Sequence, residues 1–182
     1  MNLLKNVGED KNRLIEKGEK KINELKEIRK KMRTLNPDNP KDAEILEKLE
    51  DREIEIVHEL SKLDVGVKVL EILEFIIRKG IFRGYWKDIE EKISYDELIE
   101  IIVSNGLNIK KICMEIYNRA NINDEEILKN IEKLPDTSKK YNIKDEINNL
   151  EKIKERIKKL KILKDHFDKM DTKELKNMIL KD

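Results

Sequence analysis

Apolar residues recur with a heptad spacing between Asp42 and Lys79, and this stretch predicts one long helix. The seam positions are Leu46, Leu49, Ile56, Leu60, Leu63, Val67, Leu70 and Ile77. Alternating steps of three and four residues keep such positions on one face, as in coiled coils, and no proline interrupts the stretch. Glu53 and Glu74 occupy the two seam positions that break the pattern. From Val65 onward apolar residues appear on every face, which predicts that this half of the helix is buried.

A second amphipathic helix is expected before this one, over about Glu9 to Leu35. Its apolar stripe consists of Ile15, Ile22, Leu25, Ile28, Met32 and Leu35. Residues 36–40 read Asn-Pro-Asp-Asn-Pro and should end the helix, because proline lacks an amide hydrogen and restricts the residue before it. Two long helices joined by a short turn predict an antiparallel hairpin.

Shorter helices are expected after residue 80. A turn rich in glycine and aromatic residues, 80–86, leads into a short helix ending near Ile93, and Ser94-Tyr95-Asp96-Glu97 matches a capping box that starts another. Two more are expected over about 109–120 and from Asp124 to the residue before Leu134. A long C-terminal helix over about 144–169 then carries the seam Ile143, Leu150, Ile153, Ile157, Leu160 and Phe167. A last short helix follows Asp171.

These elements predict an all-α fold with long antiparallel helices around a cluster of shorter ones. The long helices are the N-terminal hairpin and the long C-terminal helix. We expect a single helical domain over 1–182. Within it, residues 9–63 form a helical hairpin extension, 64–135 the central helical cluster, and 136–182 the long C-terminal helix and the short terminal one.

The charge along the chain is unevenly distributed, although the net charge is only +1. Residues 1–35 carry a balance of +5, residues 36–79 of −5, residues 80–138 of −4 and residues 139–182 of +5. Either the basic ends pack on the acidic middle, or they form a basic surface for a polyanion. Charged residues make up 43% of the chain and aromatic residues 4%, and the richness in Lys and Glu resembles thermophile compositions.

The sequence also predicts a cytoplasmic protein. No signal peptide opens the chain, and no apolar run approaches the roughly 18 residues that a membrane span needs. The single Cys113 excludes an intramolecular disulfide and a cysteine-only zinc site. No cofactor is indicated.

Two sequence patterns that contain His58 suggest a metal site or a catalytic site. Glu55-Ile56-Val57-His58 places a carboxylate and an imidazole on one helix face, as in di-iron bundles, but the other histidine, His166, has Leu163 where the second glutamate is required. We therefore expect no metal site. Arg52 and His58 form an R-x5-H that resembles the R-x4-6-H signature of HEPN-type ribonucleases. The resemblance implies a small helical dimer in which His58 acts as general acid/base and Arg52 stabilises the phosphate.

Two further patterns bear on nucleic acid. Residues 98–119 read as helix, Asn-Gly turn and helix, but the second helix offers only Lys110, Lys111 and Arg119 as cations. The aromatic corner of Phe82, Tyr85 and Trp86 could stack on bases or anchor the core. We favour the core.

Basic helix faces are the strongest remaining signal. In the C-terminal helix they comprise Lys152, Lys154, Arg156, Lys158, Lys159 and Lys161; in the first helix they comprise Lys26, Arg29, Lys30 and Arg33. These residues either form a solvated surface with ion pairs between neighbouring turns or bind nucleic acid.

The sequence as a whole favours a non-enzymatic helical binding protein, with nucleic acid as the leading candidate partner. Another protein, bound through helix packing, is a second candidate partner. Two alternatives stay open. One is a HEPN-like ribonuclease that needs no metal, and the other is a structural protein whose seams serve its own homodimer.

Overall fold

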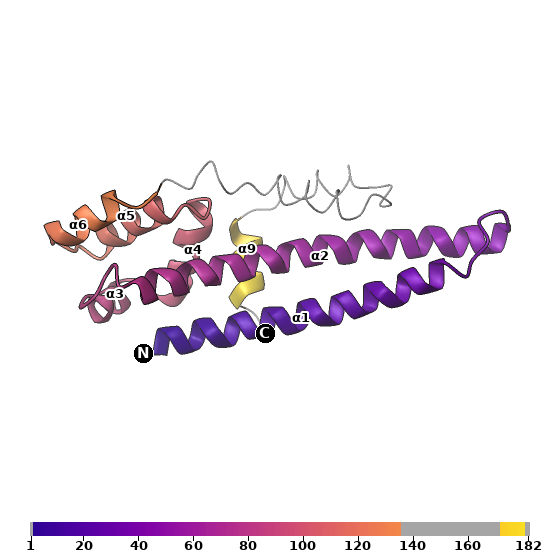
Figure 1. The fold of residues 1–182 in the computed structure, drawn as a ribbon, viewed down its shortest axis with the longest axis horizontal. Helices are drawn as coiled ribbons and strands as arrows, with labels where there is room; N and C mark the ends of the chain where they lie inside the picture. Colours follow the sequence, from indigo (N-terminus) through magenta and orange to yellow (C-terminus); the bar gives the residue numbers. More distant parts are fainter. Residues whose placement is uncertain (1, 136–171, 181–182) are drawn as a thin grey trace. The chain divides into compact units, whose positions relative to one another are not determined.

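The protein is all-α in every part of the chain that the structure describes. A computed structural model describes residues 2–135 and 172–180. Its helices are α1 (Asn2–Met32), α2 (Pro40–Lys79), α3 (Trp86–Lys92), α4 (Tyr95–Ser104), α5 (Ile109–Arg119), α6 (Glu125–Glu132) and α9 (Thr172–Leu180) (Figure 1). The predicted fold class is therefore confirmed. The predicted C-terminal helix over 144–169 lies outside the described residues.

The fold divides into two compact units, and each is described by itself. The hairpin unit consists of Leu14–Asp64, and the core unit consists of residues 2–13, 65–135 and 172–180 among those described. The helices α1 and α2 each supply residues to both units. Residues 2–13 and 172–180 thus belong with the helical cluster, whereas the sequence-based division of the whole chain stays a prediction.

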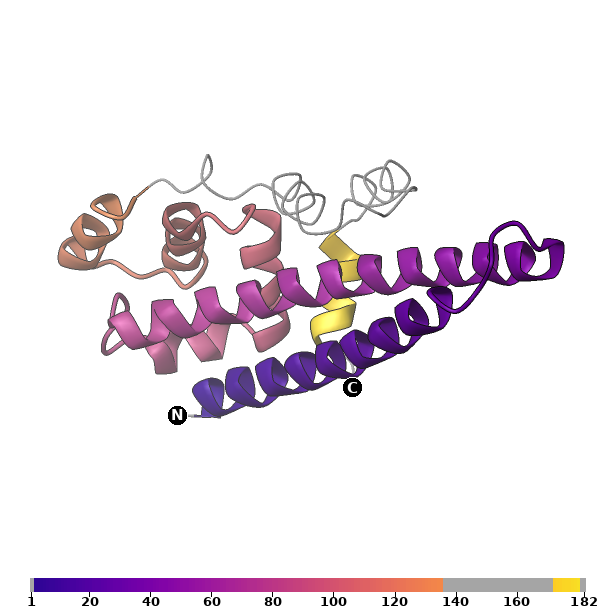
Figure 2. The same cartoon turned by 45° about the vertical axis from the view of Figure 1, so that its right-hand side comes forward.

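The hairpin unit contains two antiparallel helices. Cross-helix ion pairs join Lys21 to Glu59 at 2.7 Å and Arg29 to Glu53 at 2.9 Å. Residue numbers therefore rise along α1 while those of the paired residues fall along α2, which makes the two helices antiparallel. Figures 1 and 2 both show these parts of α1 and α2 side by side. The core between them contains the buried residues Leu25, Ile56 and Val57, with Ile28, Ile54 and Leu60 packed against it.

The two glutamates that interrupt the seam of α2 each face a cation on α1. Glu53 is only 7% exposed and accepts a hydrogen bond from Arg29. Glu74, in the core unit, pairs with Lys11 at 3.3 Å. A carboxylate can occupy an apolar seam when a cation compensates it, because an unpaired buried charge is costly.

The prediction of the first helix was wrong about the residue at which the helix begins and about part of its buried apolar stripe. The helix begins at Asn2 because Leu3 and Val7 are buried in the core unit. Ile15 and Ile22, which we expected to be buried, are 41% and 43% exposed, whereas Leu14 is fully buried. Adjacent residues differ by about 100° around a helix, so a shift of one residue turns Ile15 away from the core.

The core unit is built around the C-terminal half of α2. Val69, Leu73 and Ile76 of this helix are fully buried, and the short helix α9 packs against α4, where Lys176 pairs with Glu100 at 3.0 Å. The predicted capping box is present, since Ser94 caps α4 by accepting a hydrogen bond from the Glu97 amide.

One face of this half of α2 is exposed, contrary to the prediction of burial on every side. Phe75 is 42% exposed and Ile72 is half-buried. Apolar residues on every face thus do not lead to complete burial here, because the described neighbours in the core unit leave the side of Phe75 open.

Candidate functional site

The cations predicted at the end of α1 fall into two groups in the hairpin unit. Lys26, Lys30 and Arg33 are exposed, whereas Arg29 is half-buried. Arg33 directly follows α1, and its amide still donates to the Arg29 carbonyl at 3.2 Å, so it continues the helical spiral. Steps of four and three residues place Lys26, Lys30 and Arg33 on one face along about 10 Å of helix. We call these three residues the α1 cation cluster.

Arg29 serves the hairpin instead. Its Nε donates to the Glu53 carboxylate at 2.9 Å, and the Glu53 side chain is only 9% exposed. Losing this cation would leave a carboxylate in the helix interface without its partner. Arg29 was predicted to bind nucleic acid, but this pairing makes its guanidinium a structural group, less available to an external phosphate than its neighbours.

Carboxylates neutralise the other cations at the interface between the two helices. Arg52 bonds Glu24 at 2.7 Å and Glu55 at 3.0 Å, and Lys21 pairs with Glu59 at 2.7 Å. None of the described residues forms an ion pair with the α1 cation cluster. Residues 26–33 contain five cations and the single carboxylate Glu27. This stretch of α1 is thus basic, and the negative end of the helix dipole favours cations there.

The predicted catalytic pair, Arg52 and His58, lies on α2 in the hairpin unit. Hydrogen bonds from Arg52 to Glu24 and then Glu55 raise the pKa of Arg52 above its ordinary value. To stabilise a phosphate, the guanidinium would have to exchange these carboxylates for it. His58 is half-buried. The ribonuclease resemblance stays a prediction, and the geometry gives it no support.

The other side chains that could take part in catalysis or metal binding are hydrogen-bonded or buried. The Glu55 carboxylate of the E-x-x-H accepts a hydrogen bond from Arg52. No cluster of three or more metal-ligating side chains is present in residues 2–135 and 172–180. Burial raises the pKa of the Cys113 thiol to about 12, so it is not a nucleophile at neutral pH.

The helix-turn-helix candidate offers few available cations. Lys110 donates to the Glu132 carbonyl at 3.0 Å, and Arg119 pairs with Glu115 at 3.2 Å. Of the three, only Lys111 is exposed and has an ammonium group without a hydrogen bond or ion pair to the described residues. A recognition helix needs several side chains directed at phosphates and bases, which α5 does not provide.

The aromatic corner belongs to the core rather than to a surface for bases. Phe82 is fully buried, Trp86 is 8% exposed, and their rings meet edge to face at 5.8 Å. Tyr85 donates to the Asp124 carboxylate at 2.9 Å. Buried rings cannot stack on incoming bases, so for Phe82 and Trp86 the favoured interpretation as core residues agrees with the structure, while Tyr85 is half-buried.

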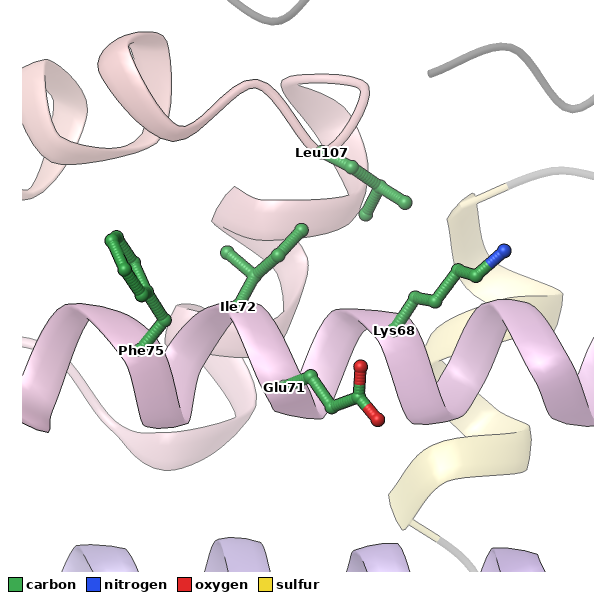
Figure 3. Close-up of a pocket in the computed structure, with 5 residues that line it drawn as sticks. All are labelled: Lys68, Glu71, Ile72, Phe75 and Leu107. Carbon is green, nitrogen blue, oxygen red and sulfur yellow. The ribbon is translucent and has the colours of Figure 1, made fainter. Parts of the chain in front are cut away.

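An apolar hollow that the sequence did not reveal lies in the core unit. Figure 3 shows Ile72 and Phe75 projecting from α2 toward the turn that carries Leu107. With Lys68 and Glu71 these residues line a concavity of about 260 Å³. Leu107 has a positive φ of 61°, which orients the turn between α4 and α5. The hollow is slightly below the size typical of small-molecule sites, and it contains few polar groups.

The basic residues predicted in the C-terminal helix lie outside the described residues. They are Lys152, Lys154, Arg156, Lys158, Lys159 and Lys161. The candidate interface within the described residues is therefore the α1 cation cluster. It lies on the surface of a helical hairpin in an all-α protein.

Comparison with known proteins identifies a relative along nearly the whole chain. The chain is 45% identical over 175 residues to the uncharacterized protein MJ0948 of Methanocaldococcus jannaschii, covering 94% of this chain and 92% of the relative. The chain belongs to the family of this archaeal protein. No protein-family model and no solved structure matches it. No helix within the described residues is long and apolar enough to cross a membrane.

Proposed function

We propose that the protein is a non-enzymatic helical binding protein that contacts nucleic acid through its basic helix faces. The α1 cation cluster is the part of this surface that lies within the described residues. The observation that supports the proposal is a contrast within one unit. Lys21, Arg29 and Arg52 are paired with carboxylates, whereas the α1 cation cluster is exposed and has no such partner among the described residues.

This contrast matters because paired and unpaired cations respond differently to a polyanion. A paired cation must break an ion pair before it contacts a phosphate, and its carboxylate then repels that phosphate. An exposed, unpaired cation has neither cost, and its phosphate contact releases counterions from the nucleic acid. Such contacts hold the backbone and carry no direct sequence information. The predicted basic run over 152–161 would extend the same kind of surface, and a cytoplasmic location suits this role.

The direct test is binding of a fluorescently labelled 20-base-pair duplex, followed by anisotropy at low salt. The variant Lys26→Ala/Lys30→Ala/Arg33→Ala should bind at least about tenfold more weakly than the parent chain. The matched control removes three exposed lysines scattered over three helices, Lys20→Ala/Lys48→Ala/Lys87→Ala. It loses the same net charge and should bind nearly as the parent does. No binding by the parent at low salt, or equal losses in both variants, would contradict the proposal.

The nuclease alternative gives a different outcome with RNA. A nuclease of that type would cleave RNA without metal, and His58→Ala would abolish the cleavage. The proposal expects the RNA to remain full length while its complex forms. Metal-independent cleavage that depends on His58 would replace a binding function by an enzymatic one.

A further inference from the structure

The described residues of the hairpin unit lack the side chains that single-strand recognition usually employs. Residues 14–64 contain no Phe, Tyr or Trp. Proteins that bind single strands stack bases on aromatic rings, and each stacked base contributes about 1–3 kcal/mol. In the 82–86 corner, Phe82 and Trp86 are buried in the core unit, and the half-buried Tyr85 donates a hydrogen bond to Asp124. Binding at the α1 cation cluster therefore depends on charge.

Charge alone favours a duplex over a single strand. A duplex presents one phosphate per about 1.7 Å of its axis, and one strand presents one per about 3.4 Å. Along the ~10 Å that the cluster spans, a duplex thus offers about six phosphates and an extended strand about three. Each contact also releases more counterion from a duplex, ~0.9 against ~0.7 per phosphate.

The same surface has little means of reading bases. Residues 26–33 contain no Asn or Gln, the residues that recognise adenine by paired hydrogen bonds. Lys26 and Lys30 act as point charges toward phosphates. Arg33 alone has a planar group able to stack or to form two parallel hydrogen bonds.

We propose that the α1 cation cluster binds double-stranded nucleic acid through its phosphates alone, irrespective of base sequence. This inference rests on the proposed function and specifies its ligand class. It assigns Lys26, Lys30 and Arg33 equivalent roles as cations. It also predicts that the chemical identity of the cation at position 33 is unimportant, provided that the charge is kept.

The test is a competition experiment with the full chain and a labelled duplex. The competitors are unlabelled DNA duplexes rich in A+T or in G+C, an RNA duplex, and one strand of the DNA without its complement. We expect the duplexes to compete within about twofold of one another and the single strand at least about fivefold less well. Arg33→Lys should bind within about twofold of the parent, whereas Arg33→Ala should bind more weakly.

The opposite results separate the inference about duplex phosphates from the proposed function. Equal or better competition by the single strand, dependence on base sequence, or a large loss in Arg33→Lys would overturn binding through duplex phosphates alone while leaving a nucleic-acid function in place. Binding to duplex DNA but not duplex RNA would also overturn it, since both present phosphates. Absence of binding to every nucleic acid would overturn the proposed function itself, and this inference with it.

Discussion

Removing the guanidinium of Arg29 should destabilise the hairpin more than the substitution of an exposed residue in the last turns of α1. Arg29 compensates Glu53, which is 7% exposed within an otherwise apolar seam. Breaking a fully buried ion pair costs about 3–5 kcal/mol, mostly because the remaining charge is left without its partner. The Arg29 side chain is 32% exposed, so water can partly solvate the site after the change. We therefore expect Arg29→Ala to lower the free energy of unfolding by about 2 kcal/mol.

Urea denaturation followed by far-UV circular dichroism measures this change, with Lys30→Ala as the matched control. Lys30 is the next residue along α1 and is exposed, so its loss should alter stability by less than about 0.5 kcal/mol. A third variant, Arg29→Met/Glu53→Leu, replaces the pair by apolar side chains and should recover most of the lost stability. If Arg29→Ala were as mild as Lys30→Ala, or if the double variant were no better than Arg29→Ala, the pair would not have the role that we assign to it.

Further predictions concern the core unit. Phe82→Ala should cost about 3–5 kcal/mol in urea denaturation because the ring is fully buried, whereas Phe75→Ala at the exposed hollow should cost less than about 1 kcal/mol; similar costs would contradict the burial pattern. Ser94→Ala should cost about 1 kcal/mol by removing the cap of α4, and a silent change would argue against that cap. The hydrogen bond from Tyr85 lowers the pKa of Asp124, so the stabilisation is present above the unfolded-state value of about 3.9 and is lost as the pH falls through the lower folded-state pKa. Melting temperatures between about pH 2 and pH 6 should therefore fall less steeply in Tyr85→Phe than in the parent chain, and parallel curves would refute this.

The hydrophobic pattern predicted the helices better than it predicted which of their faces are buried. The long heptad seam, which contains no proline, identified α2, and local capping residues such as Ser94 identified the start of α4, because each of these signals depends on residues that are near one another in the sequence. The orientation of α1 depends instead on how its side chains fit α2. Leu14 and Ile15 are both apolar, and only the packing shows that the first is buried and the second exposed.

The candidate site was likewise predictable only in part. Spacing alone places Lys26, Arg29, Lys30 and Arg33 near one another on α1. Spacing cannot show which of them forms an ion pair with α2, because that depends on the register between α1 and α2. A clue was present in the sequence, since Glu53 interrupts an apolar seam and such a carboxylate requires a cation on the facing helix. The hollow beside Phe75 gave no such signal, because it forms where α2 meets a turn distant in sequence.

The salt dependence of duplex binding tests most directly whether the α1 cation cluster contacts phosphates. Anisotropy titrations at several salt concentrations give the slope of log affinity against log salt. This slope is negative, and its magnitude rises by ~0.9 for each duplex phosphate contacted. Replacing Lys26, Lys30 and Arg33 by Ala should reduce the magnitude of that slope by about 2 to 3 units. The variant Lys20→Ala/Lys48→Ala/Lys87→Ala should leave it unchanged. An unchanged slope in the first variant would show that the α1 cation cluster does not contact phosphates, because binding would then use other cations.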